Sequence, residues 1–409
     1  MLILNFLFGK IGYKKIENGE LKMSKEDRIK LIKELQDIRK SKVICYLTSD
    51  RQSFQSFQFG INEDMIRPFY EHLLYCSKSK DSKIDLLIYS LGGHGGVPWK
   101  LVQMIREFCS EFNVIVPFRA YSAATLIALG ADNIIMGQKG ELGPIDARVA
   151  NDFNPLDPSD SSKNKKFPIG VEDMNFYLYL SKDKAKLKKP KLRLEVFKEL
   201  TKRINPLALG NVYRFNYHSR LVAQKMLDSH NIPLSKREKK NVIKKFIEES
   251  YFHGHAIGRK EAINDLKLKT VKYATNSEEE IIWNLFLKYE SEMKLNNIFH
   301  PETILRENKK EEDIIENIIG AIIESENITH IFRTDVFIRL VRAIPQNFII
   351  NIENIQFPGL DPKAIPPDIV EVIKKIIVKA TRDEIDKFKK NQPIIGTESR
   401  LINLKWEKI

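Results

Sequence analysis

Two stretches in the first third of this 409-residue chain decide its fold: DLLIYSLGGHGG at residues 85–96 and VIVPFRAYSAATLIALGAD at residues 114–132. Each begins with an apolar run typical of a buried strand, makes a sharp turn and continues as a helix. The first turn offers glycine N–H groups, and the second places Ser122 at a helix N-terminus. Because acyl transfer needs N–H donors beside an activated hydroxyl, the pair indicates a serine hydrolase, and we interpret it as a peptidase.

The sequence on both sides of these stretches alternates strands with helices. Strands are predicted at residues 42–48, 85–90, 114–119 and 133–136, and helices at residues 24–40, 63–78, 97–112 and 122–131. Such alternation favours right-handed βαβ units and a mostly parallel sheet. The predicted fold class is therefore α/β.

After residue 149 the alternation stops. Residues 151–166 are rich in Asp, Ser, Pro and Lys and predict an exposed loop. The patterns beyond it predict helices at residues 182–203 (interrupted at Pro190), 205–231, 235–250 and 278–290, with a mixed segment at 251–270. After the polar residues 294–310, we predict helices at 313–324, 335–343 and 367–389 and a candidate strand at 347–354.

The cysteine content and the apolar segments restrict the class of protein. Cys45, Cys76 and Cys109 form neither a disulfide framework nor a zinc-type pair, and Cys109 is assigned to core packing. No run reaches the roughly 18 apolar residues that span a bilayer. The apolar residues 1–8 lack the features of a signal peptide, so we expect a cytoplasmic protein. These residues predict a buried strand or docking segment, with peripheral membrane contact as the alternative.

The chain carries a net charge of +13, and much of the excess lies in residues 182–203. Such a segment can bind nucleic acid, an anionic membrane or an acidic protein surface. No nucleic-acid-binding motif accompanies it. A solvated helical face is the preferred interpretation of this segment.

The motifs resemble those of the ClpP-like clan of serine peptidases, in particular its signal peptide peptidase A (SppA) branch and the serine dehydrogenase proteinase family. The resemblance covers roughly residues 42–149 and resumes at 251–270. It implies a ClpP/crotonase-like core of βαβ units. The chain is accordingly divided into an N-terminal segment and helix (1–40), a serine protease domain (41–293) with a helical insertion (151–250), and a C-terminal, mainly helical accessory region (294–409).

The resemblance implies the roles of the residues in the two turns. Ser122 matches the nucleophile at the start of a helix rich in small residues. Gly92 matches one donor of the oxyanion hole, with Gly93 as the second choice, and the N–H of Ala123 would be the other donor. Glycine suits the first position because it turns tightly and leaves its N–H uncovered.

The general base departs from the ClpP pattern. The stretch about two dozen residues after Ser122 holds Asp146 where that pattern has a histidine, and the distant stretch expected to hold the aspartate carries His253 and His255. We therefore predict a triad with the two roles exchanged in chain order. His253 is the base, Asp146 orients it, and His255 is the second choice of base.

A Ser–Lys dyad, as in the SppA branch, is the rival arrangement. Lys163 is its main candidate, with Lys165 and Lys166 beside it. A lysine acts as a base only after burial lowers its pKa. Since these lysines lie in a polar, charged loop, we favour His253.

Two other histidine patterns are weaker. His253 and His255 could form a metal pair, but no carboxylate or thiol at a typical spacing joins them, so neither a metal nor another cofactor is expected. His94, within the glycine turn, either lines the substrate cleft or lies exposed in the turn.

The leading prediction is a serine-type endopeptidase that forms an acyl-enzyme. No GxxxxGK[ST] motif is present, so the activity is predicted to be ATP-independent in this chain. The expected partners are a protein or peptide substrate, further copies in a homo-oligomer, and a protein bound through residues 294–409. Two alternatives remain, namely a crotonase-type acyl-CoA hydratase or lyase, which would use a carboxylate in place of the serine, and a non-catalytic assembly module.

Overall fold

The computed structural model describes residues 25–51, 59–76, 81–145, 148–149, 151–157, 166–248, 255–343 and 367–409. A large mixed sheet lies at its centre. The strands of this sheet are β1 (Lys42–Thr48), β2 (Lys83–Tyr89), β3 (Glu111–Val116), β5 (Asn133–Met136), β10 (Val271–Tyr273), β11 (Glu312–Ser325), β12 (Thr329–Arg342) and β13 (Ile394–Lys408). They follow the order β10-β5-β3-β2-β1-β11-β12-β13. The five strands from β10 to β1 run parallel, and β11, β12 and β13 are added antiparallel.

Helices cover both faces of the parallel half of the sheet. One face carries α2 (Ile66–Cys76), α3 (Val97–Arg106), α4 (Ala123–Leu129), α7 (Pro206–Asp228) and α8 (Lys236–Ile243), and the other carries α1 (Lys25–Arg39) and α10 (Asn276–Glu292). Successive side chains of a strand point to opposite faces. In β1, Ile44 and Tyr46 accordingly pack in the first core and Val43, Cys45 and Leu47 in the second. A parallel sheet buried on both faces explains why its strands are continuously apolar.

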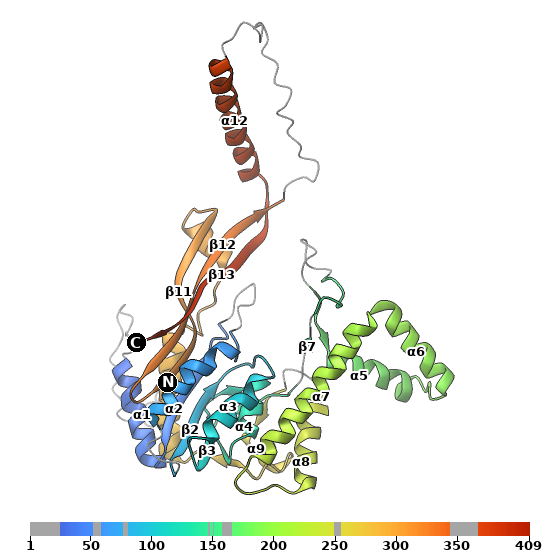
Figure 1. Cartoon of the computed structure of the whole chain (residues 1–409), viewed down its shortest axis with the longest axis vertical. Coiled ribbons are helices and arrows are strands. Elements are labelled where there is room, and N and C mark those ends of the chain that lie inside the picture. The colour runs from blue at the N-terminus through green and yellow to red at the C-terminus, as the bar shows by residue number, and fades with distance from the viewer. Residues whose placement is uncertain are drawn as a thin grey trace, which may run out of the picture.

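Shorter elements connect and extend this core. They are η1 (Glu63–Met65), β4 (Arg119–Ala120), β6 (Glu141–Leu142), β7 (Arg148–Val149), β8 (Ile169–Gly170), α5 (Val171–Tyr179), the π-helical η2 (Leu180–Lys184), α6 (Pro190–Arg203), the π-helical η3 (Lys244–Glu248), β9 (Ile257–Gly258), α9 (Arg259–Asn264), α11 (Pro301–Glu307) and α12 (Pro367–Lys390). Figure 1 shows β12 and β13 extending from the core toward α12, and α5 and α6 projecting to one side.

The α/β core predicted from the sequence is confirmed. Strands β1 and β5 have the predicted bounds, and α1, α3 and α4 begin within one residue of theirs. The three cysteines are buried free thiols, and Cys109 packs in the core as expected. None of the described helices combines the length and the apolar character needed to cross a membrane.

The helices predicted at residues 313–324 and 335–343 are wrong, because these residues form strands β11 and β12. Pairs of isoleucine recur every four residues in β11, which imitates a helical period. Register shifts between Ile315 and Ile318 and between Ile319 and Ala321 allow this spacing within a strand. The C-terminal region is therefore not mainly helical in its described part. The candidate strand at 347–354 and the apolar residues 1–8 lie outside the described residues.

A buried ion pair ties β11 to the two helices on one face of the sheet. Arg28 on α1 donates from Nε to Glu324 Oε2 at 2.7 Å, and both side chains are almost fully buried. Tyr289 on α10 donates its hydroxyl to the same carboxylate oxygen at 2.7 Å. Removing one partner of such a pair is costly, because the other charge remains buried without compensation.

A histidine pair lies where α2 packs against β11 and β12. His72 is fully buried, with Nδ1 2.8 Å from Ser325 Oγ and Nε2 3.1 Å from His330 Nδ1. Glu71 and Lys408 lie at the edge of this pair and contact each other. Burial lowers the pKa of His72 to about 3, and the neighbouring His330 and Lys408 add to this effect.

This pair predicts acid sensitivity of the fold. The pKa of His72 in the folded state lies below its unfolded value of about 6.5, so the unfolded chain binds the proton first as the pH falls. The contribution of neutral His72 to the free energy of unfolding is complete at pH values above about 6.5 and is lost progressively as the pH falls below that value. We expect a loss of about 2 kcal/mol in the free energy of unfolding between pH 7 and pH 5 from His72.

Denaturant titrations at the two pH values check this expectation. In His72→Asn, the difference between the two unfolding free energies should shrink by about 2 kcal/mol. His218→Asn is the matched control, because the side chain of His218 is exposed, and it should retain the wild-type difference. An unchanged difference in His72→Asn would show that His72 is not the acid-sensitive group.

Candidate active site

The two turns singled out by the sequence lie side by side. Tyr121 donates its N–H to the carbonyl oxygen of Ser90 at 2.9 Å, and Ser90 donates its N–H to that of Arg119 at 3.0 Å. A Cβ at Gly92 would lie 2.8 Å from Cβ of Ser122 and 3.3 Å from its Oγ. The glycine turn after β2 therefore approaches Ser122 more closely than any residue with a side chain would permit.

Ser122 has a strained backbone. Its φ of 51° and ψ of −109° lie outside the regions that residues with a side chain normally occupy. Its side chain makes no capping hydrogen bond to α4, so it does not act as an ordinary helix cap. Backbone strain at a single residue of this kind often marks a functional position.

The N–H groups around Ser122 differ in their hydrogen bonding. The N–H of Gly92 donates to Ser90 Oγ at 3.1 Å. Gly93 lies opposite Ile61 in a β-bridge, but its own N–H takes no part in the two hydrogen bonds of that bridge. In these bonds, the N–H of Ile61 donates to the carbonyl oxygen of Gly92, and the N–H of His94 donates to the carbonyl oxygen of Ile61. Within the described part of the chain, the N–H groups of Gly93 and Ala123 have no acceptor. These two donors remain available to a ligand.

A small sheet brings three distant segments together beside Ser122. Strand β4 pairs parallel with β6, and β6 pairs antiparallel with β9. Thr125, buried on α4, lies 2.7 Å and 2.8 Å from the carbonyl oxygens of Ala120 and Gly143 and offers its hydroxyl proton to them. This side chain connects α4 to β4 and to the residue that follows β6. The sequence analysis did not identify Thr125. A polar residue within an otherwise apolar helix could have indicated that its hydroxyl makes a buried hydrogen bond.

A cluster of polar side chains that the sequence analysis did not predict lies beside the turn that holds Ser122. Tyr121 donates its hydroxyl to Glu141 Oε2 at 2.7 Å, and Tyr89 donates to Asp50 Oδ2 at 2.6 Å. Arg119 lies between the two carboxylates, 3.7 Å from Glu141 and 3.6 Å from Asp50. Burial and the hydrogen bond to Glu141 raise the pKa of Tyr121 to about 12. The phenol therefore stays protonated near neutral pH and holds β6 against the turn.

The residues predicted as base and orienting acid are not brought together by the described structure. Asp146, His253 and Lys163 lie outside the described residues. His255 is exposed, with Nε2 2.8 Å from Glu261 Oε1. These assignments therefore stay predictions.

The remaining candidates have local roles. His94 is exposed, and its Nδ1 accepts the N–H of Gly96 at 3.3 Å. Lys165 lies outside the described residues, and Lys166 is half-buried in a bridge with Leu156. Among the residues that the structure describes, no three His, Cys, Asp or Glu side chains gather into a metal site.

Comparison with known proteins confirms the resemblance to the ClpP-like clan and its serine dehydrogenase proteinase family. Residues 1–201 match the family described as ClpP-like SDH-type serine proteinase. This match covers β1 to α4, and with them Gly92 and Ser122. The matched residues are 201 of the 409 in the chain.

Two uncharacterised proteins of Methanocaldococcus jannaschii are related to this chain. MJ0137 is 33% identical over 124 residues, which are 30% of this chain and 43% of that protein. MJ1495 is 36% identical over 70 residues, which are 17% of this chain and 24% of that protein. The matched region thus spans less than half the length of either relative.

Two solved structures match this chain with low sequence identity and low TM-scores. ClpP1 from Listeria monocytogenes is 12% identical, with 59% of this chain and 96% of that chain covered and a TM-score of 0.31. A mutant form of the 1510-N membrane-bound stomatin-specific protease is 12% identical, with 58% and 83% covered and a TM-score of 0.30.

Proposed function

We propose that this chain is a serine endopeptidase in which Ser122 is the nucleophile. The observation that carries the proposal is the strained backbone of Ser122, with φ at 51°. Ser122 lies directly against Gly92, and its side chain makes no capping hydrogen bond to α4. Backbone strain of this kind costs about 1–3 kcal/mol and persists where function requires it. The match to a serine proteinase family supports the same chemistry.

Two N–H groups are proposed to form the oxyanion hole. The N–H of Ala123 follows the nucleophile directly, and no acceptor meets it in the described part of the chain. Gly92 was the preferred second donor from sequence, but its N–H donates to Ser90 Oγ. Since the N–H of Gly93 is left available, we assign the second donor to Gly93. Such donors stabilise the charge that develops on the carbonyl oxygen.

The small sheet supports His253 as base and Asp146 as its orienting carboxylate. Because β4 and β6 are parallel, their C-terminal ends meet at the same edge, and Ser122 follows β4. Strand β9 is antiparallel, so its N-terminal end reaches that edge too. Asp146 stands four residues after the end of β6, and His253 four residues before the start of β9. A triad is defined by its geometry and not by the order of its residues in the chain.

The proposed reaction has two acyl-transfer steps. Ser122 Oγ attacks the peptide carbonyl carbon while its proton passes to the imidazole of His253, and the N–H groups of Gly93 and Ala123 bind the oxyanion. The C–N bond then breaks, and the leaving amine takes the proton from the imidazolium. Water attacks the resulting ester in the same way, with His253 again accepting and returning a proton. Asp146 holds the imidazole and balances its positive charge.

Two finer features belong to the same proposal. The chain has no GxxxxGK[ST] motif, so we propose that hydrolysis by this chain needs no ATP. A homo-oligomer is proposed from the family resemblance, and the substrate is a peptide or an unfolded protein segment.

A fluorophosphonate probe tests the nucleophile directly. We expect covalent labelling of the full chain, with peptide mapping by mass spectrometry placing the adduct on Ser122. A folded protein that resists labelling, or that carries the adduct on another serine, would contradict the proposal.

A substitution in the glycine turn is expected to damage catalysis specifically. In Gly92→Ala, a Cβ at φ 120° would lie 2.8 Å from Cβ of Ser122 and would displace the nucleophile. We expect kcat/KM for a peptide substrate to fall by about 100-fold or more, since small displacements of reacting groups have effects of this size.

Gly95→Ala is the matched control in the same turn. A Cβ at Gly95 meets no atom within 4 Å, and its φ is not positive. This variant should keep kcat/KM within about threefold of wild type, a change that corresponds to well under 1 kcal/mol. Equal activity in the two variants would show that the approach of Gly92 to Ser122 is unimportant.

A further inference from the structure

Helices α5, η2 and α6, residues 171–203, form an extension that we call the basic arm. Figure 1 shows α5 and α6 projecting away from the central sheet and α7 leading back to the core. The arm is rooted in a small apolar cluster of Ile169, Val171, Ala208 and Val212. Beyond this root, α6 buries none of its residues. The arm therefore presents most of its surface to its surroundings.

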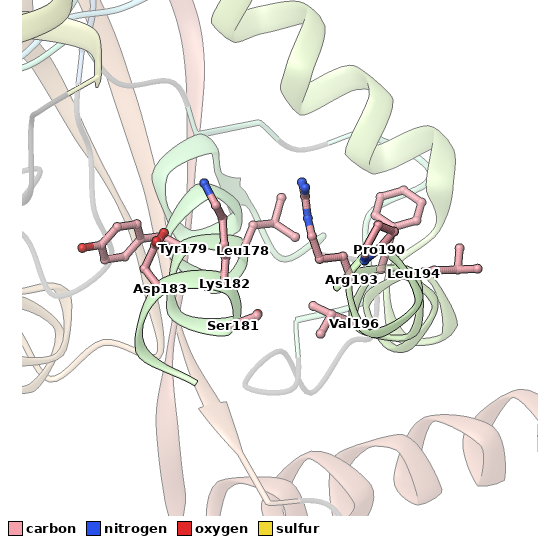
Figure 2. Close-up of a pocket in the computed structure, with 10 residues that line it drawn as sticks. Leu178, Tyr179, Ser181, Lys182, Asp183, Pro190, Arg193, Leu194 and Val196 are labelled. Atoms are coloured by element: carbon pink, nitrogen blue, oxygen red, sulfur yellow. The ribbon is translucent and has the colours of Figure 1, made fainter. Parts of the chain in front are cut away.

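Large apolar side chains on the arm are exposed. Tyr179, Leu180, Leu194 and Phe197 are each about half exposed, at 50%, 56%, 52% and 51%. A groove runs between the two helical segments. Figure 2 shows Leu178 and Val196 on facing sides of this groove, with the cationic ends of Lys182 and Arg193 directed to the same rim. Cationic and apolar groups are thus interleaved.

The arm holds a large share of the positive charge of the chain. The arm, residues 171–203, contains ten Lys and Arg against five Asp and Glu, a net charge of +5 out of +13 for the whole chain. Lys198 and Lys202 pair with glutamates on the same helix. Within the described residues, the exposed Lys188, Lys189 and Lys191 have no ion-pair partner. These lysines remain free to bind an anionic surface.

We propose that the basic arm docks on the surface of an anionic lipid bilayer. Its half-exposed leucines and aromatic rings would enter the boundary between headgroups and acyl chains, and its lysines would bind the anionic headgroups. A nucleic acid would use the lysines but would not require exposed Leu194 or Phe197. A second copy of the arm would bring two positive surfaces together, which costs free energy.

The second exposed apolar helix, α12, lacks this charge. Val372 and Ile376 are more than half exposed, but residues 367–390 carry seven Lys and Arg against five Asp and Glu, a net charge of +2. Both helical surfaces therefore expose apolar side chains, and the arm carries the larger net positive charge, +5 against +2. For this reason α12 supplies matched controls.

Flotation of the full chain with lipid vesicles tests the proposal. We expect binding to vesicles of phosphatidylserine and phosphatidylcholine in equal parts, weakening as salt is raised, and none to pure phosphatidylcholine. Lys188→Glu with Lys189→Glu should lower binding by more than about tenfold, because each lysine near an anionic surface contributes several-fold. Leu194→Ser with Phe197→Ser should also lower it by about tenfold or more, through loss of apolar insertion.

The controls carry the same chemical changes on α12. Lys379→Glu with Lys390→Glu, and Val372→Ser with Ile376→Ser, should bind the mixed vesicles as wild type does. Absence of binding to the mixed vesicles at low salt would overturn the proposal. Full binding by the Leu194→Ser, Phe197→Ser variant would also overturn it, because the arm would then be a site for polyanions such as RNA. A change of oligomeric state in the arm variants, without a change in vesicle binding, would instead identify the arm as a contact between copies.

Discussion

Ser122→Ala is expected to lower kcat/KM for peptide hydrolysis by about 10⁴-fold or more and to abolish labelling by a fluorophosphonate. The reason is chemical, since alanine has no hydroxyl to form the acyl-enzyme, whereas the N–H donors and the cleft remain. The measurement is steady-state hydrolysis of a peptide substrate together with labelling of the folded protein. Ser110→Ala, on an exposed turn, should label as the wild type does.

The variant Ser122→Gly distinguishes the catalytic role of this residue from the effect of its strained backbone on the free energy of unfolding. Glycine reaches φ 51° and ψ −109° without steric strain, so this variant should be inactive and yet more stable than Ser122→Ala by about 1 kcal/mol or more. Denaturant titration of the two variants measures this difference. Residual labelling of either variant, or full hydrolysis, would remove Ser122 from the mechanism.

His253→Ala is expected to lower the rate of acylation by about 10⁴-fold or more, because the hydroxyl of Ser122 would have no group to take its proton. Asp146→Asn should lower it by about 10⁴-fold, because a neutral amide neither balances the imidazolium nor holds the required tautomer. The burst of product release in the first turnover measures acylation in each variant.

Two further variants test the other bases considered. His255 is exposed and bonded to Glu261, so His255→Ala should leave acylation within about threefold of wild type, and we expect the same of Lys163→Ala. A large loss confined to Lys163→Ala would replace the triad with a Ser–Lys dyad. A large loss confined to His255→Ala would move the base by two residues along the chain.

The parallel half of the fold was predictable because its signals are local. Runs such as residues 85–88 and 114–116 are continuously apolar, as strands buried on both faces must be, and amphipathic helices follow them. Each element could therefore be recognised without knowing its neighbours. The bounds of β1 and β5 agree with the prediction to the residue.

The C-terminal strands were not predictable in this way, because their conformation depends on a distant partner. Strand β11 binds the open edge of β1, with Tyr46 opposite Ile323, and Glu324 reaches Arg28 in the first helix. Taken alone, the isoleucine pairs of β11 fit the period of a helix. The edge of β1 and the register shifts in β11 explain why they form a strand. Tertiary pairing here overrides the local pattern.

The residue types of the proposed site could be recognised from the sequence, but their relative positions in space could not. A glycine turn after one strand and a serine at the start of a helix after another can be recognised locally, because both depend on the conformational limits of single residues. Only the folded chain brings Gly92 against Ser122, directs the N–H of Gly92 to Ser90 and leaves that of Gly93 available. Those features depend on contacts between segments some 30 residues apart, which no local pattern in the chain encodes.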